Sequence, residues 1–336
     1  MTDAPTLKLL NLRPTGPVPA RSVRPSPARA GRVVSIGGGK GGIGKSLVAV
    51  NLAIELARRG EKVVLVDGDL GGANLHTCLG IDRPRRSLSD FIERRTARIE
   101  DVVTPTGIPN LGLVSGARDA FGGDDAANPK YAQKLRLLRH IQGMQVDHAI
   151  IDLGAGTHLD VLDFFLVSDH GILVLVPEPT AVESVYRFVK AAFWRRVRNV
   201  VSVYGFEAQL RSVMGEGTFR SPVEIVAALS ARHPEAGQLV SAQLEAFRPR
   251  LVVNQARTAQ DAEIGHAVVS AWRKFFGLEM DYLGHIPYDL ELWRTARARR
   301  PLLAGSPDSP AARSFARIAD RLAALDAAQA RSEGTP

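Results

Sequence analysis

A glycine- and lysine-rich segment near the start of the chain has the spacing of a loop that holds phosphate groups. Its sequence satisfies the pattern G-x-x-x-x-G-K-[ST]. Glycines let successive backbone N–H groups curl around an anion, and a helix starting near Ser46 would point its positive end at the same anion. Lys45 would then place its charge on the β- and γ-phosphates, and the Ser46 hydroxyl would bind Mg²⁺. The segment consists of Gly39, Lys40, Gly41, Gly42, Ile43, Gly44, Lys45 and Ser46.

Two other interpretations of the same segment have to be weighed. It could be a glycine-rich turn without a ligand. It could also be a dinucleotide site, because Gly37, Gly39 and Gly42 fit the pattern G-x-G-x-x-G. Asp67 would then bind a ribose hydroxyl. A nucleoside triphosphate is favoured, because a dinucleotide site does not need the Gly-Lys-Ser sequence that ends the segment.

Acidic residues follow two apolar segments that have the composition of buried strands. Residues 62–66 lead to Asp67 and Asp69. Residues 148–151 lead to Asp152. Open α/β sheets bind ligands at the carboxyl ends of their parallel strands. One carboxylate there could hold Mg²⁺ or its water shell while another orients an attacking water, although a polar turn also accounts for the acids.

Segments with strand composition alternate with segments of helical periodicity over most of the chain. This alternation predicts an α/β fold with a doubly wound, mostly parallel sheet and helices on both faces. Residues 203–249 interrupt it with two expected helices, the first opened by a capping box of Ser221 and Glu224. Residues 116–130 are expected to be mobile. We expect strands at residues 33–36, 62–66, 111–116, 148–152, 172–176, 251–254 and 281–287, and further helices at residues 46–59, 86–103, 131–142, 181–199, 261–276 and from 309 onward.

The sequence divides into a basic arm, one large domain and a short tail. Residues 1–31 contain six prolines and lack a sustained period, so they should form a disordered arm. This arm is either a solvated tail or an adaptor for acidic surfaces. Residues 32–330 should form the phosphate-loop (P-loop) domain, with 203–249 as a helical insertion. Residues 331–336 should form a flexible tail.

The composition excludes several classes of protein. Cys78 is the only cysteine, which excludes an intrachain disulfide and a Cys-x-x-Cys metal site. No apolar run approaches the roughly 18 residues that span a bilayer, and the N-terminus lacks the apolar core of a secretory signal, so a cytoplasmic protein is expected. The net charge of +8 comes largely from the arm, so it is weak evidence for a nucleic-acid partner.

Two helices carry side chains that could meet a partner. The helix at residues 181–199 has five basic residues, which could contact DNA phosphates or an acidic protein, or face solvent. The last helix has an apolar stripe that could enter a membrane, but Asp320 and Asp326 lie near it and favour packing on the sheet. The basic residues are Arg187, Lys190, Arg195, Arg196 and Arg198, and the stripe consists of Phe315, Ile318, Leu322 and Leu325.

Four segments resemble, in sequence order, the signature motifs of the MinD/ParA family of ATPases. The first is similar to the deviant Walker A motif of that family, in which Lys40 is an additional lysine early in the loop. The likeness covers roughly residues 32–202 and 250–325. Within it, residues 69–75 look closer to MinD and the flagellar-number regulators (FlhG/FleN) than to plasmid ParA. The four segments are residues 40–46, 67–75, 152–156 and 284–287.

This resemblance implies a function and a catalytic set. It implies a slow, partner-stimulated ATPase that dimerises when ATP and Mg²⁺ are bound and recruits partners to position a cellular structure. Lys40 would reach across the dimer to the phosphates held by the partner subunit. Lys45 would bind phosphates in its own subunit, and Asp69 would orient the catalytic water.

The same resemblance implies the remaining ligand contacts. Ser46 would bind Mg²⁺, and Asp67 and Asp152 would belong to the metal shell and the switch regions. Asn254, whose amide can pair with a base edge, would contact the adenine. Pro287, in the last signature, would also contact the nucleotide.

Departures from the family limit what the resemblance implies. The C-terminus does not resemble the basic amphipathic membrane helix of MinD, so stable membrane anchoring is not expected. The arm lacks the glutamine-containing motif of the flagellar-number regulators. Residues 203–249 have no counterpart in the short members, so a protein partner would dock on this insertion or on the arm. The single cysteine argues against the related iron–sulphur carriers. Two other functions stay open: a scaffold locked by nucleotide, and a partition-type ATPase that binds DNA nonspecifically.

Overall fold

The computed structural model describes residues 31–69, 72–116 and 131–333. Residues 1–30 of the predicted arm and nearly all of the segment predicted to be mobile therefore lie outside the described residues. The strands are β1 (Arg32–Gly37), β2 (Val63–Asp67), β3 (Val103–Pro105), β4 (Leu111–Val114), β5 (His148–Asp152), β6 (His170–Leu175), β7 (Arg250–Ala256) and β8 (Asp281–Pro287).

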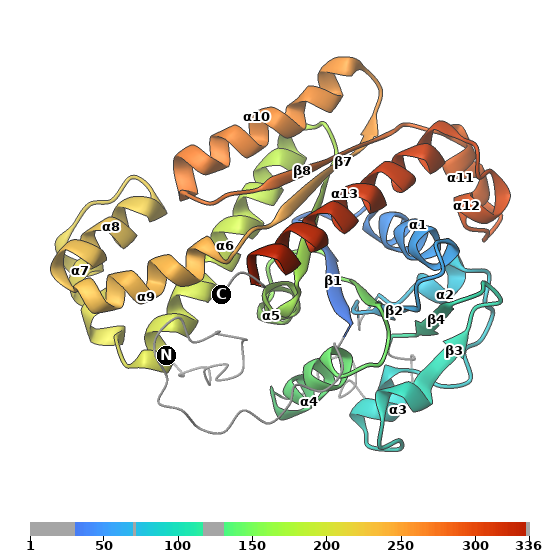
Figure 1. Ribbon diagram of the computed structural model, residues 1–336, viewed down its shortest axis with the longest axis horizontal. Coiled ribbons are helices and arrows are strands. Elements are labelled where there is room, and N and C mark those ends of the chain that lie inside the picture. Colours follow the sequence, from blue (N-terminus) through green and yellow to red (C-terminus); the bar gives the residue numbers. More distant parts are fainter. Residues whose placement is uncertain (1–30, 70–71, 117–130, 334–336) are drawn as a thin grey trace.

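These strands form one eight-stranded sheet in the order β3-β4-β2-β5-β1-β6-β7-β8. Neighbouring strands are parallel except for the antiparallel pair of β3 and β4. The mostly parallel α/β sheet predicted from the sequence is confirmed (Figure 1). Strand β2, which follows β1 in the sequence, lies on one side of β1, and β6, which follows β5, lies on the other side. The order in which strands are added to the sheet therefore reverses beside β1, where such sheets bind ligands.

Helices cover both faces of this sheet, as the doubly wound topology requires. The helices are α1 (Lys45–Arg58), α2 (Leu75–Cys78), α3 (Leu88–Ile92), α4 (Tyr131–Gln142), α5 (Leu159–Val167), α6 (Pro179–Tyr204), α7 (Glu207–Glu216), α8 (Pro222–Arg232), α9 (Pro234–Glu245), α10 (Ala259–Phe276), α11 (Leu290–Arg297), α12 (Leu302–Gly305) and α13 (Pro310–Glu333), with a 3₁₀ helix, η1 (Ile99–Val102). Helices α1 and α13 pack together on one face, while α5, α6 and α10 lie on the other (Figure 1).

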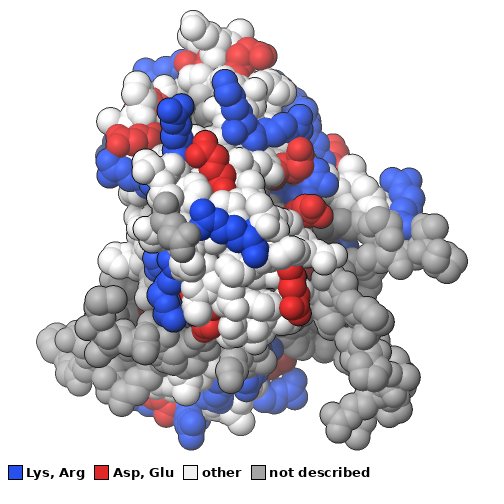
Figure 2. All heavy atoms as spheres, turned by 90° about the vertical axis from the view of Figure 1, so that its left-hand side faces the viewer, with Lys and Arg blue, Asp and Glu red and all other residues white. Residues whose placement is uncertain are grey.

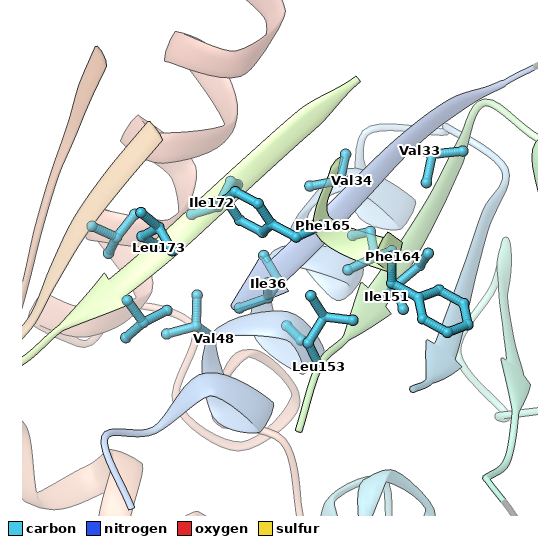
Figure 3. Packing of buried hydrophobic residues seen from close by; sticks show 14 of the residues in the cluster. Val33, Val34, Ile36, Val48, Ile151, Leu153, Phe164, Phe165, Ile172 and Leu173 are labelled. Carbon is cyan, nitrogen blue, oxygen red and sulfur yellow. The ribbon is translucent and has the colours of Figure 1, made fainter. Parts of the chain in front are cut away.

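Buried apolar side chains pack on both faces of the central strand β1 (Figure 3). Val33 and Val34 point to opposite faces and are both buried, because helices cover each face. On one face, Phe165 of α5 packs edge to face against Phe188 of α6, with ring centroids 4.9 Å apart. A Cβ at Gly171 in β6 would lie 2.6 Å from the Phe165 ring. A glycine at this position therefore lets α5 lie close to the sheet.

The prediction of one helix over residues 86–103 is wrong. Ser87 does begin a helix. The Asp90 carboxylate accepts the Ser87 backbone N–H at 2.9 Å, which is one half of a capping box, while the Ser87 hydroxyl has no hydrogen-bond partner in the described structure. That helix, α3, is short because Arg94 adopts a φ of +63°, in the left-handed region that ends helices. The rest of the segment forms η1 and the start of β3. Periodicity in the sequence does not reveal a single left-handed residue.

The insertion at residues 203–249 contains three helices, α7 to α9, rather than the two predicted. Ser221 is the residue before α8, but the carboxylate of Glu224 accepts the backbone N–H of Arg220 at 2.8 Å. The predicted capping box therefore does not form. Helices α8 and α9 pack on each other, and α9 packs on α6. The insertion is thus attached to the helices on one face of the sheet, through α6 and also through α10, which contacts α8 (Figure 1).

The C-terminal helix packs on the sheet, as predicted from its apolar stripe. Phe315, Ile318 and Leu322 are buried, and α13 contacts α1 and β8. Residues 331–333, expected in a flexible tail, belong to this helix, and residues 334–336 lie outside the described part. Helices α5, α11 and α12 were not expected from the sequence. Within the described ranges, no helix is both long and apolar enough to cross a membrane.

Candidate nucleotide-binding site

The glycine-rich segment connects the end of β1 to the start of α1, as predicted. Gly42 and Gly44 have φ angles of +77° and +89°, which side chains other than glycine rarely tolerate. Gly44 is the N-cap of α1, so the helix begins at Lys45 and its N-terminus faces the loop. The strand, the loop and the helix that phosphate binding requires are therefore all present.

Close packing on both sides also requires glycine in this loop. A Cβ at Gly39 would lie 2.1 Å from the carbonyl oxygen of Ser184 in α6. A Cβ at Gly44 would lie 2.4 Å from Nδ2 of Asn254 in β7. Neither position has room for a side chain. The loop is therefore held between α6 and the end of β7.

A cleft of about 350 Å³ opens beside the loop, at the lower end of the range for ligand pockets. It brings together side chains from α1, from the segment after β2 and from the segment after β5. Among the predicted residues, Gly41, Gly42, Gly44, Lys45, Ser46 and Asp69 line it. Leu47, Asn74, Cys78, Leu153 and Ala155 line it as well. Asn74, Leu153 and Ala155 belong to the signature segments 67–75 and 152–156, whereas Leu47 and Cys78 were not predicted site residues. The remaining predicted residues are not among those that line it: Gly39, Lys40, Ile43, Asp67, Asp152, Asn254 and Pro287.

Lys45 is the buried cation of the site. Its side chain folds back over the loop, where Nζ donates to the carbonyl of Lys40 at 3.2 Å. Burial lowers the pKa of the Lys45 ammonium, while the negative charges of Asp152 and Asp69 raise it. A positive group is thus fixed between the loop and the acids, where it can bind an anion.

Asp67 shapes the segment that follows β2. It is 1% exposed, and its carboxylate accepts the backbone N–H groups of Asn74 at 2.9 Å and Leu75 at 3.1 Å. Burial raises the pKa of Asp67 to about 6, although these backbone donors act in the opposite direction. It lies opposite Asp152 in the pairing of β2 and β5. Asp67 therefore holds the backbone at Asn74 and Leu75, at the start of α2, and its metal role stays a prediction.

Asp152 provides an oxygen that fits a metal ion. Its Oδ1 atom is buried and has no hydrogen-bond partner in the described structure. Burial raises its pKa to about 7, and a hydrogen bond with Ser46 acts in the opposite direction. Oxygen ligands of this kind suit Mg²⁺, which usually takes few protein ligands and completes its shell with phosphate and water. Within the described ranges, no group of three or more His, Cys, Asp and Glu side chains could hold a metal ion by itself.

Asp69 is the predicted catalytic acid, and it lies in the cleft itself. Its Oδ1 accepts the backbone N–H of Gly72 at 3.1 Å. A Cβ at Gly154 would lie 3.3 Å from the Asp69 carboxyl carbon, so the small residue after β5 leaves room for this carboxylate. Asp69 is thus oriented beside the phosphate loop, where a carboxylate could order a water molecule.

Lys40 points away from the cleft of its own chain. Its Nζ donates to Glu178 Oε2 at 3.3 Å and to Thr180 Oγ1 at 3.2 Å, both at the start of α6. The Lys40 side chain is 43% exposed and that of Glu178 is 60% exposed. Such exposed contacts are weak and are easily exchanged for other partners. Lys40 is therefore available at the surface next to the loop.

Asn254 binds the phosphate loop. Its Nδ2 donates to the carbonyl of Ile43 at 2.8 Å, and its Oδ1 is buried without a hydrogen-bond partner in the described part. Pro287 ends β8 beside Ala256 of β7. Neither side chain lines the cleft, so the adenine contact and the nucleotide contact of Pro287 stay predictions.

The basic residues of α6 do not form one exposed face. Arg195 donates to both carboxylate oxygens of Asp163 in α5, at 2.9 and 3.1 Å. Arg196 is 8% exposed and donates to the carbonyl of Gln243 in α9 at 2.6 Å. The face that carries the insertion shows basic and acidic residues mixed around an uncharged area (Figure 2). Arg195 and Arg196, two of the five basic residues of the predicted DNA-binding face, are therefore not available to bind DNA.

Comparisons with known proteins agree with these motifs. The ParA family model, described as NUBPL iron-transfer P-loop NTPase, matches residues 29–204. The antiactivator FleN of Pseudomonas aeruginosa is 27% identical over 293 residues, which cover 87% of this chain and 86% of FleN. The flagellum site-determining protein YlxH of Helicobacter pylori is 29% identical over 164 residues, which cover 47% of this chain and 53% of YlxH.

A solved structure shares the fold. The septum site-determining protein MinD of Pyrococcus horikoshii, complexed with Mg-ADP, matches 88% of this chain and 97% of its own, with a TM-score of 0.59 and 23% sequence identity. At this identity the likeness concerns the fold. The description of the family model mentions iron transfer, but this chain has a single cysteine and offers no pair to bridge a cluster.

Proposed function

This chain belongs to the ParA/MinD family of P-loop NTPases, and from that premise we propose that it hydrolyses ATP to ADP and phosphate in the cleft beside Lys45. The observation that carries the proposal is the grouping of a buried cation, an oriented acid and an unpartnered buried oxygen around one loop. These are Lys45, Asp69 and Oδ1 of Asp152. A dinucleotide site would need neither the lysine nor the metal ligand.

Each residue has a distinct part in the proposed reaction. The backbone N–H groups of the loop and the ammonium of Lys45 bind the phosphates and stabilise the charge that develops on them. The Ser46 hydroxyl and the Asp152 carboxylate hold Mg²⁺, which when bound neutralises phosphate charge. Asp69 orients the attacking water and can accept its proton. Asn254 keeps the loop in place by binding the Ile43 carbonyl.

Lys40 is proposed to act in a second subunit. In the described structure its ammonium lies outside its own cleft, on exposed partners at the start of α6. On formation of an ATP-bound dimer it would leave Glu178 and contact the phosphates across the interface, as an arginine finger does in trans. ATP binding would then favour the dimer, and hydrolysis would release it.

The cellular role proposed is the positioning of a structure through recruited partners. FleN is named an antiactivator and YlxH a flagellum site-determining protein, so a flagellar role is the first to test, ahead of division, polar or chromosome-related roles. We expect the protein to act in the cytoplasm, recruited by partners to a pole, nucleoid or membrane surface. The insertion and the arm are the expected contact sites.

ATP turnover measured on the full chain tests this proposal. The assay compares the chain alone, with DNA and with anionic liposomes, and includes the variant Asp69→Ala. We expect slow turnover that Asp69→Ala reduces by about 10²-fold or more, while ATP binding is kept. Nucleotide binding without turnover under every condition would favour the nucleotide-locked scaffold. Stimulation by DNA that declines steeply with salt would favour the partition-type alternative.

A further inference from the structure

An exposed aromatic and aliphatic patch lies at the start of α11. Eight large apolar side chains are exposed in the described part of the chain, and three of them fall within residues 288–293. Tyr288 is 45% exposed, Leu290 55% and Trp293 54%. Single exposed apolar residues are common, but here three lie within six residues, and two of them, Leu290 and Trp293, are three positions apart on α11 and share one helix face. We call these three residues the α11 patch.

Arginine side chains lie over the aromatic rings of the α11 patch. The guanidinium of Arg257 lies 4.4 Å from the centre of the Tyr288 ring, and that of Arg297 lies 4.7 Å from the centre of the Trp293 ring. Neither guanidinium has a carboxylate within salt-bridge distance in the described ranges. Within the described ranges neither guanidinium donates a hydrogen bond, so the N–H groups of Arg257 and Arg297 are available to a ligand.

Acidic groups beside the α11 patch are already engaged within the chain. Asp289 accepts the backbone N–H groups of Glu291 at 2.9 Å and Ala311 at 3.1 Å. Glu291 binds Arg294 at 2.6 Å and the Ser306 hydroxyl at 3.1 Å. Asp289 keeps its negative charge, but within the described ranges neither of these acids forms an ion pair with Arg257 or Arg297. The surface of the patch combines apolar area with open arginine donors.

The α11 patch is joined to the phosphate loop through one strand. The backbone N–H of Tyr288 donates to the carbonyl of Ala256 at the end of β7. Asn254, two residues earlier in β7, binds the Ile43 carbonyl in the loop. A ligand on the patch would therefore contact the same strand end that supports the nucleotide site.

We propose that the α11 patch docks an acidic protein segment that carries an aromatic or aliphatic side chain. Carboxylates would accept from the open edges of Arg257 and Arg297, and an apolar side chain would cover Leu290. A protein is favoured over single-stranded nucleic acid because each arginine covers one ring face that a base would stack on, and because the most exposed residue is aliphatic. The proposal does not depend on ATP hydrolysis.

Binding of defined probes to the full chain tests this inference. The probe is a short synthetic peptide of Asp and Glu residues around a single Phe, compared with a peptide in which Ala replaces that Phe, and with oligo(dT). Tryptophan fluorescence reports on the patch, since Trp293 is exposed, whereas Trp272 is buried and Trp194 is half-buried. Calorimetry gives the affinities of the variants. We expect the Phe peptide to bind most tightly.

Substitutions locate the binding surface. Arg257→Ala, Arg297→Ala and Trp293→Ala should each weaken the Phe peptide by about tenfold or more, because truncating a central contact costs more than about 1 kcal/mol. Met214→Ala, which removes an equally exposed side chain on α7, should leave the affinity unchanged. Circular dichroism verifies that each variant is folded. If Trp293→Ala does not fold, the affinity of Arg297→Ala still tests the patch.

Three results would overturn the inference. Tighter binding of oligo(dT) than of the Phe peptide, with the same variants affected, would assign the patch to nucleic acid. If no peptide binds and the Trp293 fluorescence instead changes with ATP and with protein concentration, the α11 patch would be assigned to contact with a second copy of the chain. If Met214→Ala and Arg297→Ala lose the same amount of affinity for the Phe peptide, the peptide binds without using the patch.

Discussion

Two lysines only five residues apart have opposite surroundings. Lys45 is 8% exposed and bonded to the loop, whereas the Lys40 side chain is 43% exposed and bonded to the start of α6. The sequence pattern predicts a phosphate contact for both. Their placement separates the roles. Lys45 can bind a ligand in its own cleft from where it lies, whereas Lys40 would first have to leave its partners at the start of α6.

Replacing Lys40 should separate ATP binding from dimerisation. Lys40→Ala removes a group that lies outside its own cleft, so we expect ATP affinity to change by less than about threefold, while dimer formation and turnover are lost. Size-exclusion chromatography with a non-hydrolysable ATP analogue measures the dimer, and a fluorescent nucleotide measures affinity. Glu178→Gln, which only frees Lys40, is the control and should still dimerise. A Lys40→Ala protein that dimerises and turns over like wild type would leave only a generic phosphate loop.

The buried acids should make the metal-free protein less stable as pH rises. Burial raises the pKa of Asp152 to about 7 and that of Asp67 to about 6, whereas the unfolded chain has values near 4. Between about pH 4 and pH 7 the folded chain therefore binds more protons than the unfolded chain, and the free energy of unfolding falls as pH rises. One pKa unit corresponds to about 1.4 kcal/mol, so the contribution of Asp152 is of the order of a few kcal/mol.

Thermal unfolding in EDTA across this pH range measures the effect. Asp152→Asn should make the stability depend less on pH, since the amide does not titrate. Adding Mg²⁺ with ADP should reduce the loss of stability at higher pH, because the metal favours the charged carboxylate. Identical pH profiles for the variant and the wild type would contradict the assignment.

Packing between elements holds the phosphate loop in place. Gly39 contacts α6 and Gly44 contacts β7, so the loop depends on two elements that follow it by well over a hundred residues. The ion pair of Arg195 and Asp163 joins α6 to α5, which follows the segment after β5. Helix α6 therefore contacts the phosphate loop and also holds α5, the helix that follows the segment after Asp152.

A matched pair of alanine substitutions tests this support. In Gly39→Ala the new Cβ would meet the Ser184 carbonyl oxygen at 2.1 Å, so the loop must move away from α6. In Gly41→Ala the nearest heavy atom is 3.9 Å away, which is ordinary contact. We expect Gly39→Ala to weaken ATP binding by about tenfold or more and Gly41→Ala to change it little, in a fluorescent nucleotide titration. Equal affinities of the two variants would show that the loop does not rely on α6.

At the scale of the whole molecule, the insertion is part of the folded body. Arg196 of α6 is buried against α9, where it donates to Gln243, and burial lowers its pKa to about 10. Val197, Val200 and Val201 on the same helix are buried as well. A partner that binds the insertion would therefore contact a surface joined to the sheet through α6.

Deleting residues 203–249 should destabilise the chain. The deletion removes the acceptors of Arg196, and hydrogen bonds to a charged group contribute about 1.5–3 kcal/mol each. It also exposes apolar area on α6. We expect a lower unfolding temperature and aggregation in size-exclusion chromatography, whereas Met214→Ala, on the exposed side of α7, should behave like wild type. A truncated monomer that unfolds at the wild-type temperature would show that the insertion is an independent module.

The sequence by itself determined the local structure and the chemistry of the loop. The bounds predicted for residues 131–142, 148–152 and 281–287 match α4, β5 and β8. The loop at residues 39–46 follows from residue types alone, since glycine conformations and a lysine-serine ending are local properties. The single helix predicted over residues 86–103 failed at one left-handed residue.

Only the tertiary structure decided which distant groups meet. Asn254 binds the carbonyl of Ile43, Lys40 lies on Glu178 instead of in its cleft, and Arg195 and Arg196 turn inward. These contacts depend on the order of the strands in the sheet and on how α6 packs, which periodicity within a segment does not encode. Residue spacing therefore predicts what each part of the site can do, and the packing of the sheet decides which parts come together.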